Sequence, residues 1–186
     1  MKAVPWKNGG GVTHEAMRVP ASGDPFTWRV SVARIDVSGP FSDFTGYQRK
    51  MVLLKGGGVE LRFADSTLRA LRAVGEIAEF DGALAAQCEL IDGPCVDLNL
   101  IVSKSLSDVS ARVAHVHDMS TVPGIAGQAT LAFPIDAAVA ISCGSDRVVL
   151  EAWDLALIPA GEDVMLSVAR RAAERRGAIF LANLPE

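Results

Sequence analysis

Short apolar runs separated by turn-forming residues restrict the fold of this chain more than any other feature. Most of them are bounded by Gly, Pro, Asp or Ser, and they comprise Trp28–Ala33, Met51–Leu54, Val96–Val102, Ala137–Ser142, Val148–Trp153 and Ala178–Leu181. Strands run to about four to eight residues, whereas helices need about ten or more. The pattern therefore predicts an all-β sandwich or barrel. Segments 66–74 and 168–176 are the best helical alternatives, but the first is flanked by turn residues and the second lacks a clean apolar stripe.

A weak internal repeat relates residues 54–102 to residues 141–184. The shared features are, in order, a Gly-bearing turn after a strand, a second turn, and a closing strand that contains Asn. They fall at Lys55–Gly58, Glu79–Gly82 and Leu98–Leu100 in the first part and at Cys143–Ser145, Ile158–Gly161 and Ala182–Leu184 in the second. Repetition of one unit predicts two stacked, barrel-like halves, because one half alone would be small for a stable core.

The chain length and its turn-rich segments suggest where the halves meet. A length of 186 residues suffices for one sizeable core or two small fused ones, so no independent second domain is required. We place the N-terminal half at 1–118 and the C-terminal half at 128–186. The connector at 119–127 contains one Pro and two Gly, which interrupt regular structure. We expect the halves to form one compact unit.

Charge and composition exclude several classes of partner. A net charge of −4 offers no field that attracts nucleic-acid phosphates, and no window approaches the roughly 18 apolar residues that a membrane-spanning helix needs. The N-terminal sequence lacks the apolar stretch of about 7–15 residues of a secretory signal, so we expect a cytoplasmic protein. Cys88, Cys95 and Cys143 form no C-x-x-C pair and are expected to be buried small hydrophobic residues.

The densest unusual segment is Trp6–Glu15, with the sequence WKNGGGVTHE. Its three consecutive glycines permit positive φ angles and close backbone approach, and they follow the cation of Lys7 and the amide of Asn8. Such a loop can hold an anion, although it is not a P-loop, in which the Lys follows the glycines. A tight turn leading into an edge strand explains the same residues equally well.

Polar side chains alternate with apolar ones along three of the predicted strands. Residues two apart share a face of a strand, so Arg29 lies with Ser31 and Asp97 lies with Asn99, while Arg49 stands on a third strand. In a barrel such a face is either solvated or lines a ligand-holding interior, and the sequence does not distinguish the two. The residue types favour a pocket, because Arg, Asn and Ser suit the orientation of a carboxylate, whereas Lys and Glu dominate ordinary surface strands.

Taken together, these segments resemble the HutD/Ves family of cupin-like proteins. The matching segments cover most of the first half of the chain in the family's order, and they are Trp6–Glu15, Trp28–Ala33, Gly39–Ser42, Gly46 with Arg49, and Gly93–Asn99. The second half matches only in its pattern of strands and turns. One departure is His14, which stands after Thr13 where an Arg is usual and bears on ligand preference or the response to pH.

The resemblance implies a bicupin, with two antiparallel jelly-roll halves, that is often encoded with the enzymes of histidine degradation. Proteins of this family are thought to moderate that pathway by binding an intermediate such as urocanate or formylglutamate, so the implied partner is a small anionic metabolite. Arg49 is implied as the main anion clamp, because a guanidinium donates two parallel hydrogen bonds to a carboxylate. The other residues implied for the pocket are Lys7, Asn8, Arg29, Ser31, Asp97 and Asn99.

Metal and covalent catalysis find little support in the sequence. His115 and His117 lie two apart on a predicted strand and point the same way, as the first two ligands of a cupin metal site do. The Glu expected four residues after the second His is Thr121, and no His follows the turn at 159–161. A G-x-S-x-G nucleophile motif is absent as well. We therefore predict no bound metal and no cofactor.

Three functions remain open at this level. The preferred one is a ligand-binding regulator of catabolic flux. The alternative is a metal-free cupin enzyme, an isomerase or hydrolase acting on a small carboxylate, with Glu15, Asp97 or a histidine as general base. The third is a structural or protein-interaction module. The sequence leaves open the identity of the ligand and whether the chain forms a homodimer.

Overall fold

The computed structural model describes residues 2–6, 9–106, 109–117, 119–169 and 176–185. Every regular element in these ranges is a β-strand, which confirms the all-β prediction, and none of them contains a helix that could cross a membrane. The strands are β1 (Lys2–Pro5), β2 (Gly11–Val19), β3 (Trp28–Ile35), β4 (Gly39–Pro40), β5 (Tyr47–Gly56), β6 (Val59–Phe63), β7 (Leu68–Leu71), β8 (Ile77–Asp81), β9 (Ala86–Leu90), β10 (Cys95–Ser103), β11 (Ala111–Val116), β12 (Ser120–Val122), β13 (Gln128–Pro134), β14 (Val139–Cys143), β15 (Asp146–Leu150), β16 (Ala156–Ile158), β17 (Val164–Val168) and β18 (Gly177–Pro185). Of the two helical alternatives, 66–74 contains β7, and 168–176 lies largely outside the described residues.

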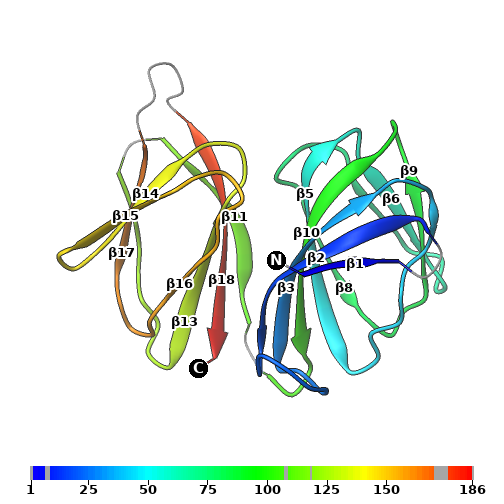
Figure 1. Ribbon diagram of the computed structural model, residues 1–186, viewed down its shortest axis with the longest axis horizontal. Coiled ribbons are helices and arrows are strands. Elements are labelled where there is room, and N and C mark those ends of the chain that lie inside the picture. The colour runs from blue at the N-terminus through cyan, green and yellow to red at the C-terminus, as the bar shows by residue number, and fades with distance from the viewer. Residues whose placement is uncertain (1, 7–8, 107–108, 118, 170–175, 186) are drawn as a thin grey trace. The chain divides into compact units, whose positions relative to one another are not determined.

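The strands divide into two compact units, Met1–Ser107 and Asp108–Glu186. Figure 1 shows two facing sheets in each unit. The first unit has a six-stranded sheet in the order β1-β2-β3-β10-β5-β8 and a four-stranded sheet in the order β4-β9-β6-β7. The second unit has the orders β11-β18-β13-β16 and β12-β17-β14-β15. Apart from β1 and β2, the two units have the same topology, in which β3 corresponds to β11 and β10 corresponds to β18.

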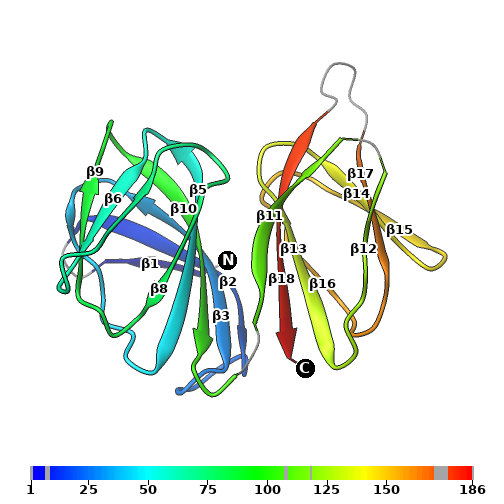
Figure 2. The same ribbon diagram turned by 180° about the vertical axis from the view of Figure 1, so that it is seen from behind.

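The division between the units lies at Ser107 and Asp108, and not within the expected connector at 119–127. Strand β11 pairs with β18, and β12, which falls inside 119–127, pairs with β17 (Figure 2). Both strands therefore belong to the second unit, and the first unit ends before residue 118. The Pro and Gly residues of 119–127 form a turn between strands, and sequence alone does not separate such a turn from a linker because both use these residues.

The structure aligns the internal repeat differently from the sequence at one turn. The closing strands correspond as predicted, with Asn99 in β10 and Asn183 in β18, and the second turns correspond as well. However, Lys55–Gly58 connects β5 to β6, whereas Cys143–Ser145 connects β14 to β15, whose counterparts are β6 and β7. Successive hairpins with Gly-bearing turns look alike in sequence, so the alignment slipped by one hairpin.

Each unit encloses an apolar core to which both of its sheets contribute. In the first unit, Met51 and Leu53 of β5 meet residues such as Leu61 of β6 in the facing sheet. Strand β6 shows the underlying pattern, because its buried apolar residues alternate with more exposed Glu60 and Arg62. Burial of each large aliphatic side chain stabilises the fold by about 1.5–3 kcal/mol. The core of the first unit holds together the sheets that carry the candidate site.

The β5–β6 turn offers a test of the backbone geometry. Gly58 has a φ of +101°, and a Cβ atom there would lie 2.3 Å from the carbonyl oxygen of Leu71. Gly93 also has a positive φ, of +72°, but a Cβ atom there would meet nothing within 4 Å. We expect Gly93→Ala to lower the free energy of unfolding by about 1 kcal/mol, and Gly58→Ala to lower it by about 3 kcal/mol or more. Urea unfolding of both variants measures this, and equal losses would contradict the close approach of Leu71.

Candidate functional site

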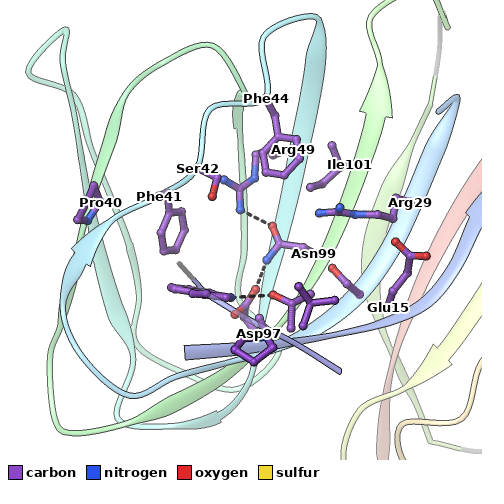
Figure 3. Close-up of a pocket in the computed structure, with 16 residues that line it drawn as sticks. Glu15, Arg29, Pro40, Phe41, Ser42, Phe44, Arg49, Asp97, Asn99 and Ile101 are labelled. Carbon is purple, nitrogen blue, oxygen red and sulfur yellow. Dashed lines mark hydrogen bonds between the residues drawn. The ribbon is translucent and has the colours of Figure 1, made fainter. Parts of the chain in front are cut away.

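A cavity of about 500 Å³ opens inside the first unit. Strands β1, β2, β3, β5 and β10 line it together with the segment 40–44. Its lining combines aromatic rings with two arginines, two carboxyl groups and several hydroxyl and amide groups (Figure 3). The lining residues are Val4, Pro5, Trp6, Thr13, Glu15, Arg29, Ser31, Ala33, Pro40, Phe41, Ser42, Phe44, Arg49, Asp97, Asn99 and Ile101.

The register of the larger sheet brings both arginines to one end of this cavity. Ile101 of β10 pairs with Arg29 of β3 on one side and with Arg49 of β5 on the other. Paired residues project from the same face, and neighbouring strands lie about 4.8 Å apart, so the two arginines start about 10 Å from each other. Figure 3 shows the Arg29 side chain extending toward Arg49, with Asn99 below the two.

The next positions along β10 supply the polar floor of the cavity. Asn99 pairs with Ser31 of β3, and Asp97 lies two residues further along the same inner face. Ser31, Asp97 and Asn99 are all buried, as is Arg49. The sequence did not decide whether this polar face is solvated or interior. In the structure it points into the unit, next to the apolar core that contains Cys95.

A β-bulge in β2 brings further charged side chains to the same face. Glu15 pairs with Ser31, and the register then shifts between Glu15 and Met17, so that Arg18 pairs with Arg29. Glu15 and Arg18 are three residues apart, so in a regular strand they would face opposite sides. The extra residue of the bulge lets both side chains face inward. Glu15 lines the cavity, whereas Arg18 forms an ion pair with Asp24 at 2.9 Å.

The Arg49 guanidinium is enclosed by rings and held by one amide. Its Cζ atom lies 5.0 Å from the ring centroids of Phe41 and Phe80 and 5.3 Å from that of Phe44. Its Nη2 atom donates a hydrogen bond of 2.7 Å to Oδ1 of Asn99. Burial lowers the pKa of Arg49 to about 10, an effect that nearby Asp97 opposes. The side chain remains a cation at neutral pH, and the ring faces stabilise that charge.

Arg29 occupies a related aromatic environment beside it. Its Cζ atom lies 5.1 Å from the centroid of Phe44 and 5.4 Å from that of Phe26. Phe44 therefore contacts both cavity arginines. Burial is also the main cause that lowers the pKa of Arg29, while the charge of Glu15 raises it. Among the described residues, no carboxylate lies within ion-pairing distance of Arg29 or Arg49.

Asn99 connects the cation of Arg49 to the carboxyl group of Asp97. Its amide oxygen accepts from Arg49, and its amide nitrogen donates to Oδ2 of Asp97. Burial raises the pKa of Asp97 to about 7, against the opposing influence of Arg49 and of hydrogen bonds to its backbone and to Asn99. Desolvation outweighs the nearby positive charge because Asp97 is completely buried and does not touch the guanidinium directly.

Three buried polar atoms of the cavity-lining residues have no hydrogen-bond partner among the residues that the structure describes. They are Nε of Arg29, Nε of Arg49 and Oδ1 of Asp97. A buried polar atom without a partner costs about 1–3 kcal/mol, and more when it belongs to a charged group. Such atoms are rare in folded proteins, and each calls for an explanation such as strain or a functional role. The cavity thus presents two donors at one end and one acceptor on its floor.

The glycine-rich segment forms the hairpin between β1 and β2. The backbone nitrogen of Trp6 donates to the carbonyl of Gly11 at 2.9 Å, and that of Gly9 donates to the carbonyl of Trp6 at 3.0 Å. Nε1 of Trp6 donates to Oγ1 of Thr13 at 2.8 Å, which holds the indole as a wall of the cavity. Lys7 and Asn8, both predicted for the pocket, lie outside the described residues. The described part of the loop forms a tight turn, but the strand that follows it, β2, pairs with both β1 and β3 and is not an edge strand.

The structure brings Arg29, Ser31, Arg49, Asp97 and Asn99 together in this one cavity. Sequence reasoning did not single out as site residues the cavity-lining aromatics Trp6, Phe41 and Phe44, nor Phe80, whose ring lies against Arg49. Phe80 is the cross-strand partner of Arg49, whereas Phe41 and Phe44 come from the segment between β4 and β5. Trp6 and Phe41 fell within the family-matching segments Trp6–Glu15 and Gly39–Ser42, whereas Phe44 lies in a loop, where no periodicity reveals the direction of a ring.

The two histidines considered as metal ligands lie in the second unit. His115 is in β11, His117 follows that strand, and both are exposed. The described residues contain no group of three or more His, Cys, Asp or Glu side chains placed to hold a metal ion. The prediction of a metal-free protein stays a prediction. Cys88 and Cys95 are buried as expected, while Cys143 is only partly buried.

The buried carboxyl of Asp97 generates a prediction about stability and pH. Its pKa of about 7 in the folded chain lies above the ordinary value of 3.8, so the folded state holds the proton more tightly than the unfolded state. The resulting stabilisation is complete below about pH 4 and is lost as the pH rises through about 7, amounting to about 4 kcal/mol at most. Asp97→Asn removes this titration. Unfolding curves at several pH values should show that the stability of the variant rises relative to that of the parent chain as the pH increases from about 4 to about 7. A stability difference that does not change with pH would contradict the assignment.

Comparison with known sequences places the chain among named relatives. A family model described as HutD matches residues 1–176. An uncharacterized 21.2 kDa protein in the hutC 3' region of Pseudomonas putida is 43% identical over 99 residues, covering 53% of this chain and 52% of that protein. Protein Ves of Escherichia fergusonii is 32% identical over 110 residues, covering 59% of this chain and 57% of that protein. The chain thus spans little more than half the length of these curated relatives.

Solved structures extend the likeness over the whole chain. A conserved protein of unknown function from Pseudomonas aeruginosa PAO1 has a TM-score of 0.88 and 31% identity, covering 100% of this chain and 94% of that one. HutD from Pseudomonas fluorescens SBW25, in a formate condition, has a TM-score of 0.78 and 28% identity with the same coverage. A cupin 2 conserved barrel domain protein from Leptotrichia buccalis, at 11% identity, shares the fold alone, with a TM-score of 0.56 over 94% of this chain and 89% of that one. The fold is therefore that of the cupins, and the chain belongs to the HutD family, which is associated with histidine utilisation.

Proposed function

We propose that the chain binds a small carboxylate metabolite in the cavity of its first unit and thereby moderates histidine or urocanate catabolism. The ligand is an intermediate such as urocanate or formylglutamate. One observation carries this proposal, namely the pair of arginines that face one cavity without a carboxylate partner among the described residues, each with a buried Nε that has no hydrogen-bond partner.

A carboxylate is the anion that best fits these arginines. A guanidinium donates two parallel hydrogen bonds to the two oxygens of a carboxylate, and Nε with a terminal nitrogen forms one such pair. Nη2 of Arg49 is engaged by Asn99, which fixes the plane of the guanidinium while Nε stays free. Hydrogen bonds to a charged group contribute about 1.5–3 kcal/mol each when the site is dry. Two of them suffice to hold a small metabolite.

The size and walls of the cavity suit a metabolite larger than formate. A volume of about 500 Å³ lies within the usual range of about 300–1,000 Å³ for small-molecule sites. Trp6, Phe41 and Phe44 provide apolar walls around the polar floor. An unsaturated or short-chain carboxylate with a polar distal group would contact both kinds of surface.

The association of the family with histidine utilisation supports a regulatory role in that pathway. A protein that binds an intermediate lowers its free concentration or responds to it. Either effect couples the level of the intermediate to the flux through the pathway.

A metal-free enzyme acting on a small carboxylate is the second candidate, and the pKa of Asp97 favours it. A buried carboxyl group with a pKa of about 7 exchanges protons readily at neutral pH, as general acids and bases must. An isomerase or hydrolase would convert the bound compound, whereas a binding protein returns it unchanged. NMR spectra of each candidate ligand after prolonged incubation with the protein separate the two functions.

The proposed clamp is tested by truncating Arg49 and measuring binding by calorimetry. Urocanate, formylglutamate, histidine, glutamate, acetate and formate serve as ligands, with chloride and a neutral amide as controls for charge and shape. Arg49→Ala should weaken carboxylate binding by about 2–4 kcal/mol, because the carboxylate loses one of its two guanidinium partners in a desolvated site. Arg49→Lys should restore only part of the affinity, because an ammonium lacks the planar fork.

The matched control is Arg147→Ala, which removes an exposed arginine from β15 in the second unit. This variant should bind carboxylates as the parent chain does. The proposal fails if no carboxylate binds below millimolar concentration, or if Arg49→Ala binds as tightly as Arg147→Ala.

A further inference from the structure

A carboxylate bound by the arginines would leave one buried polar atom of the cavity, Oδ1 of Asp97, without a hydrogen-bond partner among the described residues. The ligand's oxygens can accept from Nε of Arg29 and Nε of Arg49, but they cannot satisfy Oδ1 of Asp97, which is itself an acceptor when ionised. Oδ2 of the same carboxyl already accepts from Asn99, so the unpartnered oxygen is the one left for a ligand. Asp97 is completely buried and lines the cavity.

Within the described part of the chain, the groups around Asp97 do not donate a hydrogen bond to its Oδ1 atom. Arg49 from β5 acts on it at a distance and reaches it only through Asn99, while Arg29 and Glu15 line the same cavity from β3 and β2. Cys88 of β9 and Cys95 of β10 also interact electrostatically with Asp97. Burial raises the pKa of both thiols to about 12, so they stay neutral. Among the described lining residues, the positive charge in the cavity therefore comes from Arg29 and Arg49.

We propose that Asp97 selects carboxylates that also carry a hydrogen-bond donor, such as an amide or ring N–H, and that this donor binds Oδ1 of Asp97. The inference rests on the proposed function, because the arginines must hold the carboxylate for the donor to reach the floor. The ligand class is then a two-ended molecule, with its anion at Arg29 and Arg49 and its N–H at Asp97. Figure 3 shows this polarity, with the guanidinium groups on one side of Asn99 and the carboxyl of Asp97 on the other.

The same geometry makes the two ligand classes respond to pH in opposite directions. A ligand with an N–H donor binds the ionised form of Asp97, so its affinity should rise as the pH increases through the pKa of about 7. A plain carboxylate adds negative charge near Asp97 and favours the protonated form, so its affinity should fall over the same range. Because one proton is linked to binding, each change is limited to about tenfold per pH unit.

The test compares a ligand that has the donor with one in which a methyl group replaces it. N-acetylglycine has one carboxylate and one amide N–H, and N-acetylsarcosine replaces that hydrogen by a methyl group, while acetate serves as the plain carboxylate. Calorimetry with the full chain at about pH 8 should give tighter binding of N-acetylglycine than of N-acetylsarcosine by about tenfold or more. Between about pH 6 and pH 8, the affinity of N-acetylglycine should rise several-fold and that of acetate should fall.

Asp97→Asn assigns the effect to this residue, because it keeps the shape and the bond from Asn99 while it removes the charge and the titration. The variant should bind acetate, lose the pH dependence and reduce the preference for N-acetylglycine to less than about threefold. Equal binding of the two amides by the parent chain would overturn the inference, as would an undiminished preference in Asp97→Asn. If the variant does not fold, the two amides and their pH dependence in the parent chain still decide. If acetate binds but the N–H has no effect, this inference fails alone; if neither acetate nor the amides bind, the proposed function fails with it.

Discussion

The burial of a charged guanidinium inside a β-barrel is the constraint on which the site depends. Arg49 is 6% exposed, and in the described chain its charge is met by three phenyl rings and one amide without a contacting carboxylate. An isolated buried charge is costly, so the surrounding residues must offset it or a ligand must pair with it. The rings and the Asn99 bridge stabilise this cation in the interior, whereas the pKa of Asp97 is raised by that residue's own burial against the opposing influence of Arg49.

The second unit shows what the same topology becomes without that cation. Asn183 stands where Asn99 stands in the first unit, but it accepts from Thr130 at 3.2 Å and donates to Ser110 at 3.0 Å. Pro185 lies two residues after Asn183, as Ile101 lies two residues after Asn99. Pro185 pairs with Gln128 and Ile101 pairs with Arg49, so Gln128 corresponds to Arg49. The central asparagine is retained with local partners, and the uncharged Gln128 takes the position of Arg49. This contrast associates the cavity with the first unit's own residues and not with the shared fold.

Asp97 and the arginines together give the cavity a polarity that a simple anion site lacks. The arginines lie at one end, and Asn99 accepts a hydrogen bond from Arg49 and donates one to Asp97. The pKa of Asp97, about 7, lets this residue gain or lose a proton near neutral pH. The same feature serves discrimination between ligands and, with a suitable substrate, proton transfer. Binding and catalysis therefore differ here in the fate of the bound compound, and the electrostatic arrangement supports both.

The sequence by itself determined the all-β class and the family. It also placed Arg29 with Ser31 on one face of a strand, and Asp97 with Asn99 on one face of another. These results follow from the strand period and from contiguous motifs, which are local properties. It could not decide whether those faces were solvated or interior, since that depends on which sheet lies opposite. The positions of Phe41 and Phe44 depend on a loop path, and the boundary at Ser107 depends on β11 pairing with the distant β18. Only the tertiary structure decided these points, because each results from contacts between residues far apart in the chain.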